Sequence, residues 1–202
     1  FKNVNLNLAK GDKVVVYSKD SRATTAFYEI LNGKQNALEG KFEWGVTTNQ
    51  SYLPVDNQEY FDNELTLVDW LRQYAKTEQE REEVYLRGFL GKMIFSGEEA
   101  LKTSNVLSGG EKVRCMLSRM MMQRANVLMF DEPTNHLDLE SITAINNSLK
   151  NFKGTILLTT SDHEFAQTVG NRIVELTPKG AIDRYLTFDD YMNDPKIKEQ
   201  RE

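Results

Sequence analysis

The sequence predicts an α/β fold in which a mostly parallel sheet is interrupted by an inserted helical subdomain. Short apolar runs alternate along the chain with stretches of helical spacing, which is the pattern of strands joined by crossover helices. Residues 127–130 (VLMF) are apolar throughout, as expected of a strand buried on both faces of a parallel sheet. Between Leu65 and Ser96 the apolar residues fall at helical spacing, which places the helical subdomain at about 57–122.

The composition is that of an ordinary globular protein and excludes several classes. Of the 202 residues 40% are hydrophobic, enough for the core of one domain spanning 1–202. The net charge of −5 argues against a basic nucleic-acid surface. Cys115 is the single cysteine, so we expect no internal disulfide and a reducing, cytoplasmic setting. No apolar stretch reaches the ~20 residues of a membrane span, so no membrane is expected. Because the chain begins with Phe1, we expect it to be a fragment.

The first part of the chain is predicted to contain strands and one helix. Apolar and polar residues alternate over 4–8, which indicates a half-buried strand. Residues 14–17 read as a short buried strand, and a helix follows over 26–31, with Asn32-Gly33 as its stop signal. Residues 42–50 are aromatic and β-branched enough for a further strand region.

Beyond the helical subdomain the prediction returns to alternating strands and helices. Val113 and Met120 lie on one face of the helix that leads into the strand at 127–130. The next elements are a helix marked by Ile142, Ile145, Leu149 and Phe152, a strand over 155–160, and a hairpin of 172–176 and 181–186 around Pro178-Lys179-Gly180. Residues 194–202 are charged and are expected to begin a solvated tail.

The stretch VLMFDEPTNHLD, residues 127–138, is the most specific motif of the chain. A buried strand that ends in two carboxylates places them at the carboxyl edge of the sheet, where α/β proteins bind ligands. Asp131 could hold Mg²⁺ through water there, and Glu132 could orient and deprotonate an attacking water. The alternative is that both acids simply open the next helix, where acids are favoured. The strand and the Pro-Thr-Asn run that follows favour the catalytic interpretation.

A second motif is LSGGE, made of Leu107, Ser108, Gly109, Gly110 and Glu111. The S-x-x-E spacing is that of a capping box at the start of a helix. A capping box needs no paired glycines, and glycines lower helix stability. Paired glycines do let backbone amides approach an anion at a helix N-terminus. We expect both roles.

Residues 14–33 have the layout of a phosphate-binding P-loop, in which a strand leads through a loop into a helix. The loop lacks the glycines and the lysine of GxxxxGK[ST]. Whether it is an altered phosphate site depends on the rest of the chain.

LSGGE followed by DEPTNHLD closely resembles the ATP-binding cassette (ABC) ATPases, which have a P-loop NTPase-like fold. The TNHLD form and LTFDDYM at 186–192 resemble the ABC-F branch of that family, and the chain is similar to its second, C-terminal cassette. The resemblance implies ATP and Mg²⁺ as cofactors, a second cassette in the same full-length chain as partner, action in translation at the ribosome, and no membrane.

The resemblance also assigns positions in the P-loop. Ser18 and Ala23 match the two glycines, Thr24 the lysine, and Thr25 the hydroxyl that holds Mg²⁺. A shift by one residue would put Ala23 at the lysine position, which is no better. The residues between the two glycine positions are Lys19, Asp20, Ser21 and Arg22, of which Lys19 or Arg22 could reach a phosphate from elsewhere in the loop.

Other site residues are implied by the same resemblance. Gln50 matches the glutamine that senses Mg²⁺ and the terminal phosphate, unless it is an ordinary polar strand end. Ser161 stands where the family has a histidine that contacts the terminal phosphate, and His163 is expected to point elsewhere. The loop that faces the partner cassette is Asn135, His136, Leu137 and Asp138. The predicted metal-binding set is Thr25, Gln50 and Asp131.

These assignments predict an asymmetric cassette. Its own ATP site has lost the charges that bind triphosphate, whereas LSGGE is intact and can complete the ATP site of a partner cassette. Two other functions stay open, the motor domain of a membrane transporter and an interaction domain with no nucleotide role.

Overall fold

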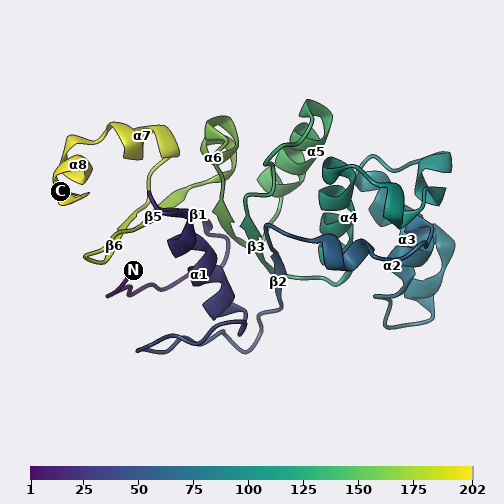
Figure 1. Cartoon of the computed structure of the whole chain (residues 1–202), viewed down its shortest axis with the longest axis horizontal. Helices are drawn as coiled ribbons and strands as arrows, with labels where there is room; N and C mark the ends of the chain where they lie inside the picture. Colours follow the sequence, from purple (N-terminus) through teal and green to yellow (C-terminus); the bar gives the residue numbers. More distant parts are fainter. Residues whose placement is uncertain (202) are drawn as a thin grey trace.

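One six-stranded sheet, in the order β2-β3-β4-β1-β5-β6, organises the computed structural model, which describes residues 1–201 (Figure 1). Strands β1 to β5 are parallel, and β6 runs antiparallel to β5 as the second strand of the predicted hairpin. The strands are β1 (Lys13–Tyr17), β2 (Gln50–Leu53), β3 (Val127–Asp131), β4 (Thr155–Thr159), β5 (Arg172–Leu176) and β6 (Ala181–Arg184). The predicted α/β class with a mostly parallel sheet is therefore confirmed.

Helices cover both faces of the sheet (Figure 1). On one face α1 (Ser21–Leu31) packs against the alternate residues Val14 and Val16 of β1. On the other face α5 (Leu139–Lys150) and α6 (His163–Val169) pack in the core that includes Leu128 and Ile156 of the central strands. All five residues of β3 and all five of β4 are buried, as a parallel sheet covered on both faces requires.

A group of helices is inserted between β2 and β3 and forms one end of the molecule (Figure 1). Its core contains aromatic as well as aliphatic residues, with Trp70 stacked on Phe61 at a ring-centroid distance of 5.0 Å. The group consists of α2 (Leu67–Arg72), α3 (Glu83–Lys92), α4 (Gly109–Met122) and the 3-10 turns Gln58–Phe61, Gln79–Arg81, Gly97–Leu101 and Ser104–Val106.

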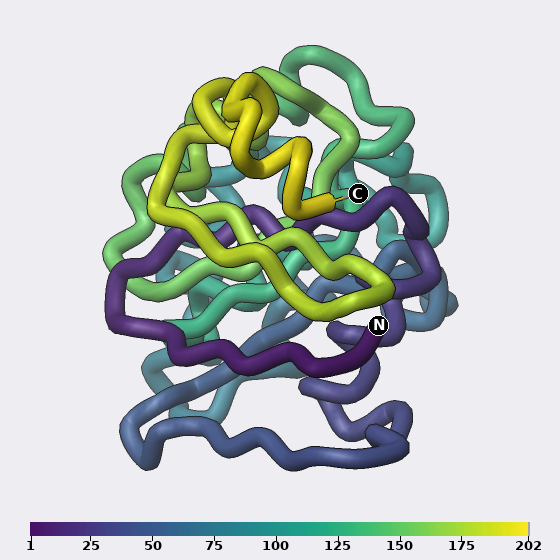
Figure 2. The backbone as a smooth tube through the Cα atoms, turned by 90° about the vertical axis from the view of Figure 1, so that its left-hand side faces the viewer, coloured from purple at the N-terminus to yellow at the C-terminus, as the bar shows by residue number. Residues whose placement is uncertain are grey.

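Two predicted strands are wrong. Residues 4–8 are extended but pair with no strand, because their apolar side chains pack on the α1 face of the sheet and the Asn7 carbonyl accepts a hydrogen bond from Arg172. Figure 2 shows this N-terminal stretch running beside the β5–β6 hairpin. Of the region 42–50, only Gln50 enters a strand; Gly45 and Thr48 form a turn before it.

The solvated tail predicted over 194–202 is wrong for residues 194–201; Glu202 lies outside the described residues. Residues 188–201 form two short helices, α7 (Phe188–Asn193) and α8 (Pro195–Arg201), and Ile197 is buried in a cluster with Ile173 of β5 and Ile182 of β6. Arg201 donates to the buried carboxylate of Glu175 on β5, with an Nη2–Oε1 distance of 2.7 Å. A buried carboxylate needs such a partner, and sequence pattern alone did not reveal the pairing.

Candidate nucleotide site

The carboxyl edge of the sheet brings together the predicted metal-binding residues of two elements. Thr25, in the first turns of α1, donates its hydroxyl to Asp131 Oδ2 at the end of β3, at 2.8 Å. Burial raises the pKa of Asp131 above its usual range, and the negative charge of Glu132 raises it further. The hydrogen bond from Thr25 lowers this pKa, but it does not cancel the effect of burial. A divalent cation would relieve this destabilisation, so the pair fits Mg²⁺ binding.

In the loop that the resemblance matches to a P-loop, the hydrogen bonds at the helix N-terminus are made within the chain. Helix α1 begins at Ser21, and its N-cap is Asp20, whose carboxylate accepts from the Arg22 amide at 3.0 Å. The Ala23 amide donates to the Asp20 carbonyl at 3.0 Å. In a P-loop such amides point at the phosphates. Here the Asp20 carboxylate occupies the position at the helix N-terminus that a phosphate takes in a P-loop.

The charged side chains of the loop do not compensate. Arg22 is turned onto Asp20, with its Nε and Nη2 atoms 3.1 and 3.0 Å from the two carboxylate oxygens. This hydrogen-bonded contact lowers the pKa of the exposed Asp20, so the carboxylate is ionised at neutral pH. Ser18 accepts from the Asp20 amide at 3.1 Å, and Lys19 is exposed to solvent.

Thr24, which the resemblance matches to the P-loop lysine, does not face the loop. Its hydroxyl donates to the Ser21 carbonyl within the same helix at 2.9 Å, and only 2% of the residue is exposed. The Mg²⁺ half of the site therefore fits the family's cofactor, whereas the phosphate-binding half does not.

Glu132 is held by the residue at the histidine position. Ser161 donates both its amide and its hydroxyl to Glu132 Oε2, at 2.9 and 3.2 Å. The backbone of Glu132 has φ +52°, a left-handed conformation that is uncommon for such a residue and worth noting at a functional site. His163 opens α6 and bonds to Asp189 of α7, away from Glu132.

The assignment of Gln50 is wrong. Gln50 pairs with Val127, the first residue of β3, whereas Asp131 is the last. In a parallel pair these positions lie at opposite edges of the sheet, roughly 13 Å apart at ~3.3 Å per residue. The amide of Gln50 donates to Thr48. The residues that follow the carboxyl end of β2 are Pro54, Val55 and Asp56, so no glutamine reaches the site from this strand.

The LSGGE segment forms an exposed helix N-terminus on α4. Ser108 and Glu111 make the predicted capping box, with a Glu111 amide to Ser108 hydroxyl distance of 3.2 Å. Because the Ser108 hydroxyl oxygen accepts this bond, its own proton is free to donate. Although burial raises the pKa of Glu111, hydrogen bonds from Lys102 and Ser108 lower it overall, and Lys102 neutralises the charge. Leu107 is buried beneath the segment.

The loop of residues 135–138 packs against LSGGE in the same chain. Asp138 caps α5 by accepting from the Ser141 amide. A Cβ at Gly110 would lie 2.5 Å from the Ser141 hydroxyl and 2.7 Å from the Asp138 carboxylate, whereas one at Gly109 would lie 3.7 Å from Leu137. The second glycine therefore has a packing role that the motif did not reveal. Asn135 and His136 are exposed, and His136 has φ +60°.

Fold and motifs together define an ATP-binding cassette. The family model described as ABC transporter matches residues 1–135, and the chain belongs to that family. Cassettes of the family bind ATP and Mg²⁺ and work in pairs.

Several curated relatives are of the ABC-F and Uup type. The chain is 51% identical over 98% of its length to the uncharacterized ABC transporter ATP-binding protein YkpA of Bacillus subtilis (strain 168). It is 35% identical over 98% to the probable ATP-binding protein YbiT of Escherichia coli O157:H7, and 25% identical over 92% to ABC transporter F family member 5 of Arabidopsis thaliana. It spans 36%, 37% and 26% of these proteins, so it covers about a third of their length or less.

Solved structures with this fold include other cassettes. The dimeric post-hydrolysis state of the cassette MJ0796 bound to ADP and Pi has a TM-score of 0.72 at 21% identity, over 92% of this chain and 90% of that one. The archaeal ribosome recycling factor aABCE1 has a TM-score of 0.72 at 22% identity, over 91% and 36%. At these identities the likeness concerns the fold alone. Within residues 1–201 no helix is long and apolar enough to cross a membrane.

Proposed function

We propose that this chain is one cassette of a two-cassette ABC-F ATPase and that it completes its partner's ATP site while hydrolysing little ATP itself. One observation carries the proposal: the carboxylate of Asp20 occupies the helix N-terminus that should bind phosphate, while the Ser108 end of α4 is exposed and open.

The chain's own site lacks favourable contacts and has an unfavourable one. A charge-assisted hydrogen bond contributes ~1.5–3 kcal/mol, so loss of both the lysine and the histidine contact weakens triphosphate binding by about two to four powers of ten. The ionised Asp20 would also repel the phosphates. Without a positioned terminal phosphate, Glu132 has no substrate to activate water against, because phosphoryl transfer depends on positioning and charge neutralisation.

The opposite half of a cassette site is preserved. At the N-terminus of α4, the amide of Gly109 and the free proton of Ser108 can donate to the phosphate of a nucleotide held by another cassette. Glu111 does not oppose this, because Lys102 pairs with it at 2.7 Å. The residues around Asn135 and His136 lie beside this surface and would face the same partner.

The ABC-F assignment rests on the relatives and on the TNHLD form of the loop. ABC transporter F family member 5 and the YkpA and YbiT proteins match over almost the whole chain. By resemblance to that branch we assign the chain to the second cassette, to the cytoplasm, and to action in translation at the ribosome. The alternative of a membrane-transporter motor predicts a transmembrane partner protein; the alternative of a pure interaction domain predicts that a partner cassette hydrolyses ATP equally well without Ser108.

Titration calorimetry with Mg²⁺-ATP tests the proposal. We expect the 202-residue chain to bind ATP at least about tenfold more weakly than the partner cassette and to show no turnover above background. Micromolar affinity together with steady hydrolysis by the chain alone would overturn the proposal. A thermal melt of the same sample establishes that the chain is folded during the titration.

A further inference from the structure

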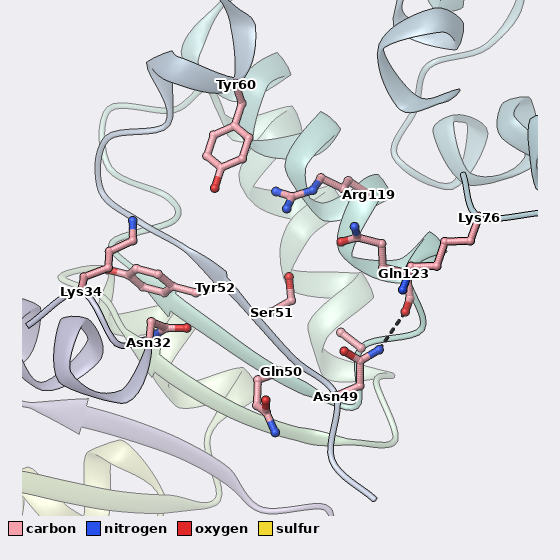
Figure 3. A pocket seen from close by; sticks show the side chains of 11 residues that line it. Asn32, Lys34, Asn49, Gln50, Ser51, Tyr52, Tyr60, Lys76, Arg119 and Gln123 are labelled. Atoms are coloured by element: carbon pink, nitrogen blue, oxygen red, sulfur yellow. Dashed lines mark hydrogen bonds between the residues drawn. The ribbon is translucent and has the colours of Figure 1, made fainter. Parts of the chain in front are cut away.

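A cavity of about 350 Å³ lies at the other edge of the sheet from the Thr25–Asp131 pair (Figure 3). It opens between the start of β2, the C-terminal end of α1 and the second half of α4. Gln50, which the register places at the amino end of β2, is one of its lining residues. Its volume is within the ~300–1,000 Å³ of small-ligand sites.

Three cationic side chains line this cavity, which we call the Arg119 pocket. They are Lys34, just after α1, Lys76 in the helical subdomain, and Arg119 on α4. Figure 3 shows Arg119 between the two lysines. No Asp or Glu lines the pocket, and within residues 1–201 none of the three cations forms an ion pair. The positive charge is thus concentrated locally in a chain whose net charge is −5.

Arg119 is fixed in place but lacks a counter-charge. Its guanidinium lies 4.8 Å from the ring of Tyr60 and 4.6 Å from the ring of Tyr74. Its Nε and Nη1 atoms are buried and have no hydrogen-bond partner in the described part of the chain. The residue as a whole is half-buried, and burying part of a cation without an anion is destabilising. An anion in the pocket would compensate its charge.

The remaining walls are amides and aromatic rings. The side-chain nitrogens of Asn32 and Asn49 donate to the carbonyls of Tyr28 and Gln123, so these two residues offer their side-chain oxygens, and Gln123 offers its side-chain amide. Tyr52 and Tyr60 are half-buried beside the cations. Cations next to aromatic rings are characteristic of surfaces that bind single-stranded nucleic acid. Amide side chains suit the edges of unpaired bases.

The positive charge continues beyond the pocket. An adjoining hollow shares Lys76 and adds Arg124, which is exposed at the end of α4. Its one acidic residue, Glu80, is engaged by the backbone amides of Lys76 and Thr77. Cations that follow one another along the surface, such as Lys76 and Arg124, suit a nucleic acid strand, which carries one negative charge per nucleotide.

We propose that the Arg119 pocket binds a phosphate and nucleotide of a single-stranded nucleic acid. This binding goes beyond the proposed ATPase role and does not depend on it, because the pocket and the nucleotide site lie at opposite edges of the sheet.

Fluorescence anisotropy with a short labelled single strand tests the proposal, with RNA and DNA as separate arms. The double variant Lys34→Gln, Lys76→Gln should bind at least about tenfold more weakly than the unaltered chain. The slope of log K against log salt should fall by at least about 0.7, since each lost phosphate contact removes ~0.7 on a single strand. The matched control Lys150→Gln, Lys153→Gln makes the same charge change on exposed residues elsewhere and should bind normally.

Two results would overturn the assignment. One is equal binding by the pocket variant and its control at matched thermal stability. The other is displacement of the strand by poly-glutamate of equal charge as effectively as by unlabelled RNA or DNA, which would show an acidic-peptide site instead. Arg119→Lys, which keeps the charge but not the planar stacking between tyrosines, should give an intermediate loss.

Discussion

The carboxylate of Asp20 lies 3.0 Å from the backbone amide of Arg22, at the N-terminus where a P-loop holds phosphate. The chain thus supplies its own anion to this helix end. Because Asp20 already caps this helix, the backbone amide that a P-loop uses for phosphate is occupied. This cap limits how far a single substitution can restore ATP binding.

Restoring the lysine alone should fail. Thr24→Lys should raise ATP affinity by less than about threefold, which is under ~0.7 kcal/mol, because Thr24 lies inside α1 and Asp20 still occupies the amide. Adding Ser18→Gly, Asp20→Ala and Ala23→Gly frees the loop to adopt positive φ and removes the repelling charge. The combined variant should gain at least about tenfold by calorimetry. Full recovery with Thr24→Lys alone would contradict the closed-loop interpretation.

Glu132→Gln should leave turnover of the two-cassette protein within about threefold of normal, under ~1 kcal/mol of barrier. The reason is that Glu132 has no well-held triphosphate to act on. The equivalent substitution in the partner cassette should lower turnover by the ~10²–10⁴ of a general base. Steady-state ATPase assays of both variants make the comparison, and equal, severe losses would show that this chain's site is catalytic.

The two glycines of LSGGE should respond differently. Gly109→Asp has room for its Cβ and places an acid at a helix N-terminus, so the fold should survive. Turnover of the two-cassette protein should fall at least about tenfold, because like charges ~4 Å apart repel by roughly 4 kcal/mol at an effective dielectric constant of about 20. Gly109→Ala, the uncharged control, should lose less.

Gly110→Ala should instead act on stability. Its Cβ would meet the Ser141 hydroxyl at 2.5 Å, an overpacking that destabilises by ~1–3 kcal/mol. Chemical denaturation measures this difference. Normal stability of Gly110→Ala, or unchanged turnover in a folded Gly109→Asp, would count against these roles.

Asp131→Asn should change the pH dependence of stability. Because the folded state raises the pKa of Asp131, the unfolded state releases this proton first, and the contribution of Asp131 to the stability of the wild type falls as pH rises from about 4 until the folded carboxyl has ionised. The melting temperature of the variant relative to wild type should therefore increase between pH 4 and 7 in the absence of Mg²⁺. Exposed Glu199→Gln is the control; a pH-independent difference would contradict the raised pKa.

The strands and motifs that follow local rules were predictable from the sequence. Continuous apolar runs located β3 and β4, and the S-x-x-E spacing located the cap of α4. The predictions failed where contacts between residues far apart in the sequence determine the local structure. Residues 4–8 alternate like a strand but pack as an extended stretch, and Arg201 folds a charged tail onto Glu175. Gln50 was misplaced because a lone glutamine does not indicate at which end of its strand it lies. A whole-chain charge of −5 could not reveal three cations gathered at one cavity.

Helix α4 joins two of the features described above. The Gly109 end is wedged against α5 through the contact of Gly110 with Ser141, and Arg119 lies ten residues further along, roughly 15 Å at ~1.5 Å per residue. An unbroken helix is stiff over this distance, since bending it sharply would break its hydrogen bonds. The N-terminus of α4 at Ser108, which we propose faces a partner cassette, and the Arg119 pocket therefore lie along one stiff helix. Neither can shift along the helix axis without moving the other.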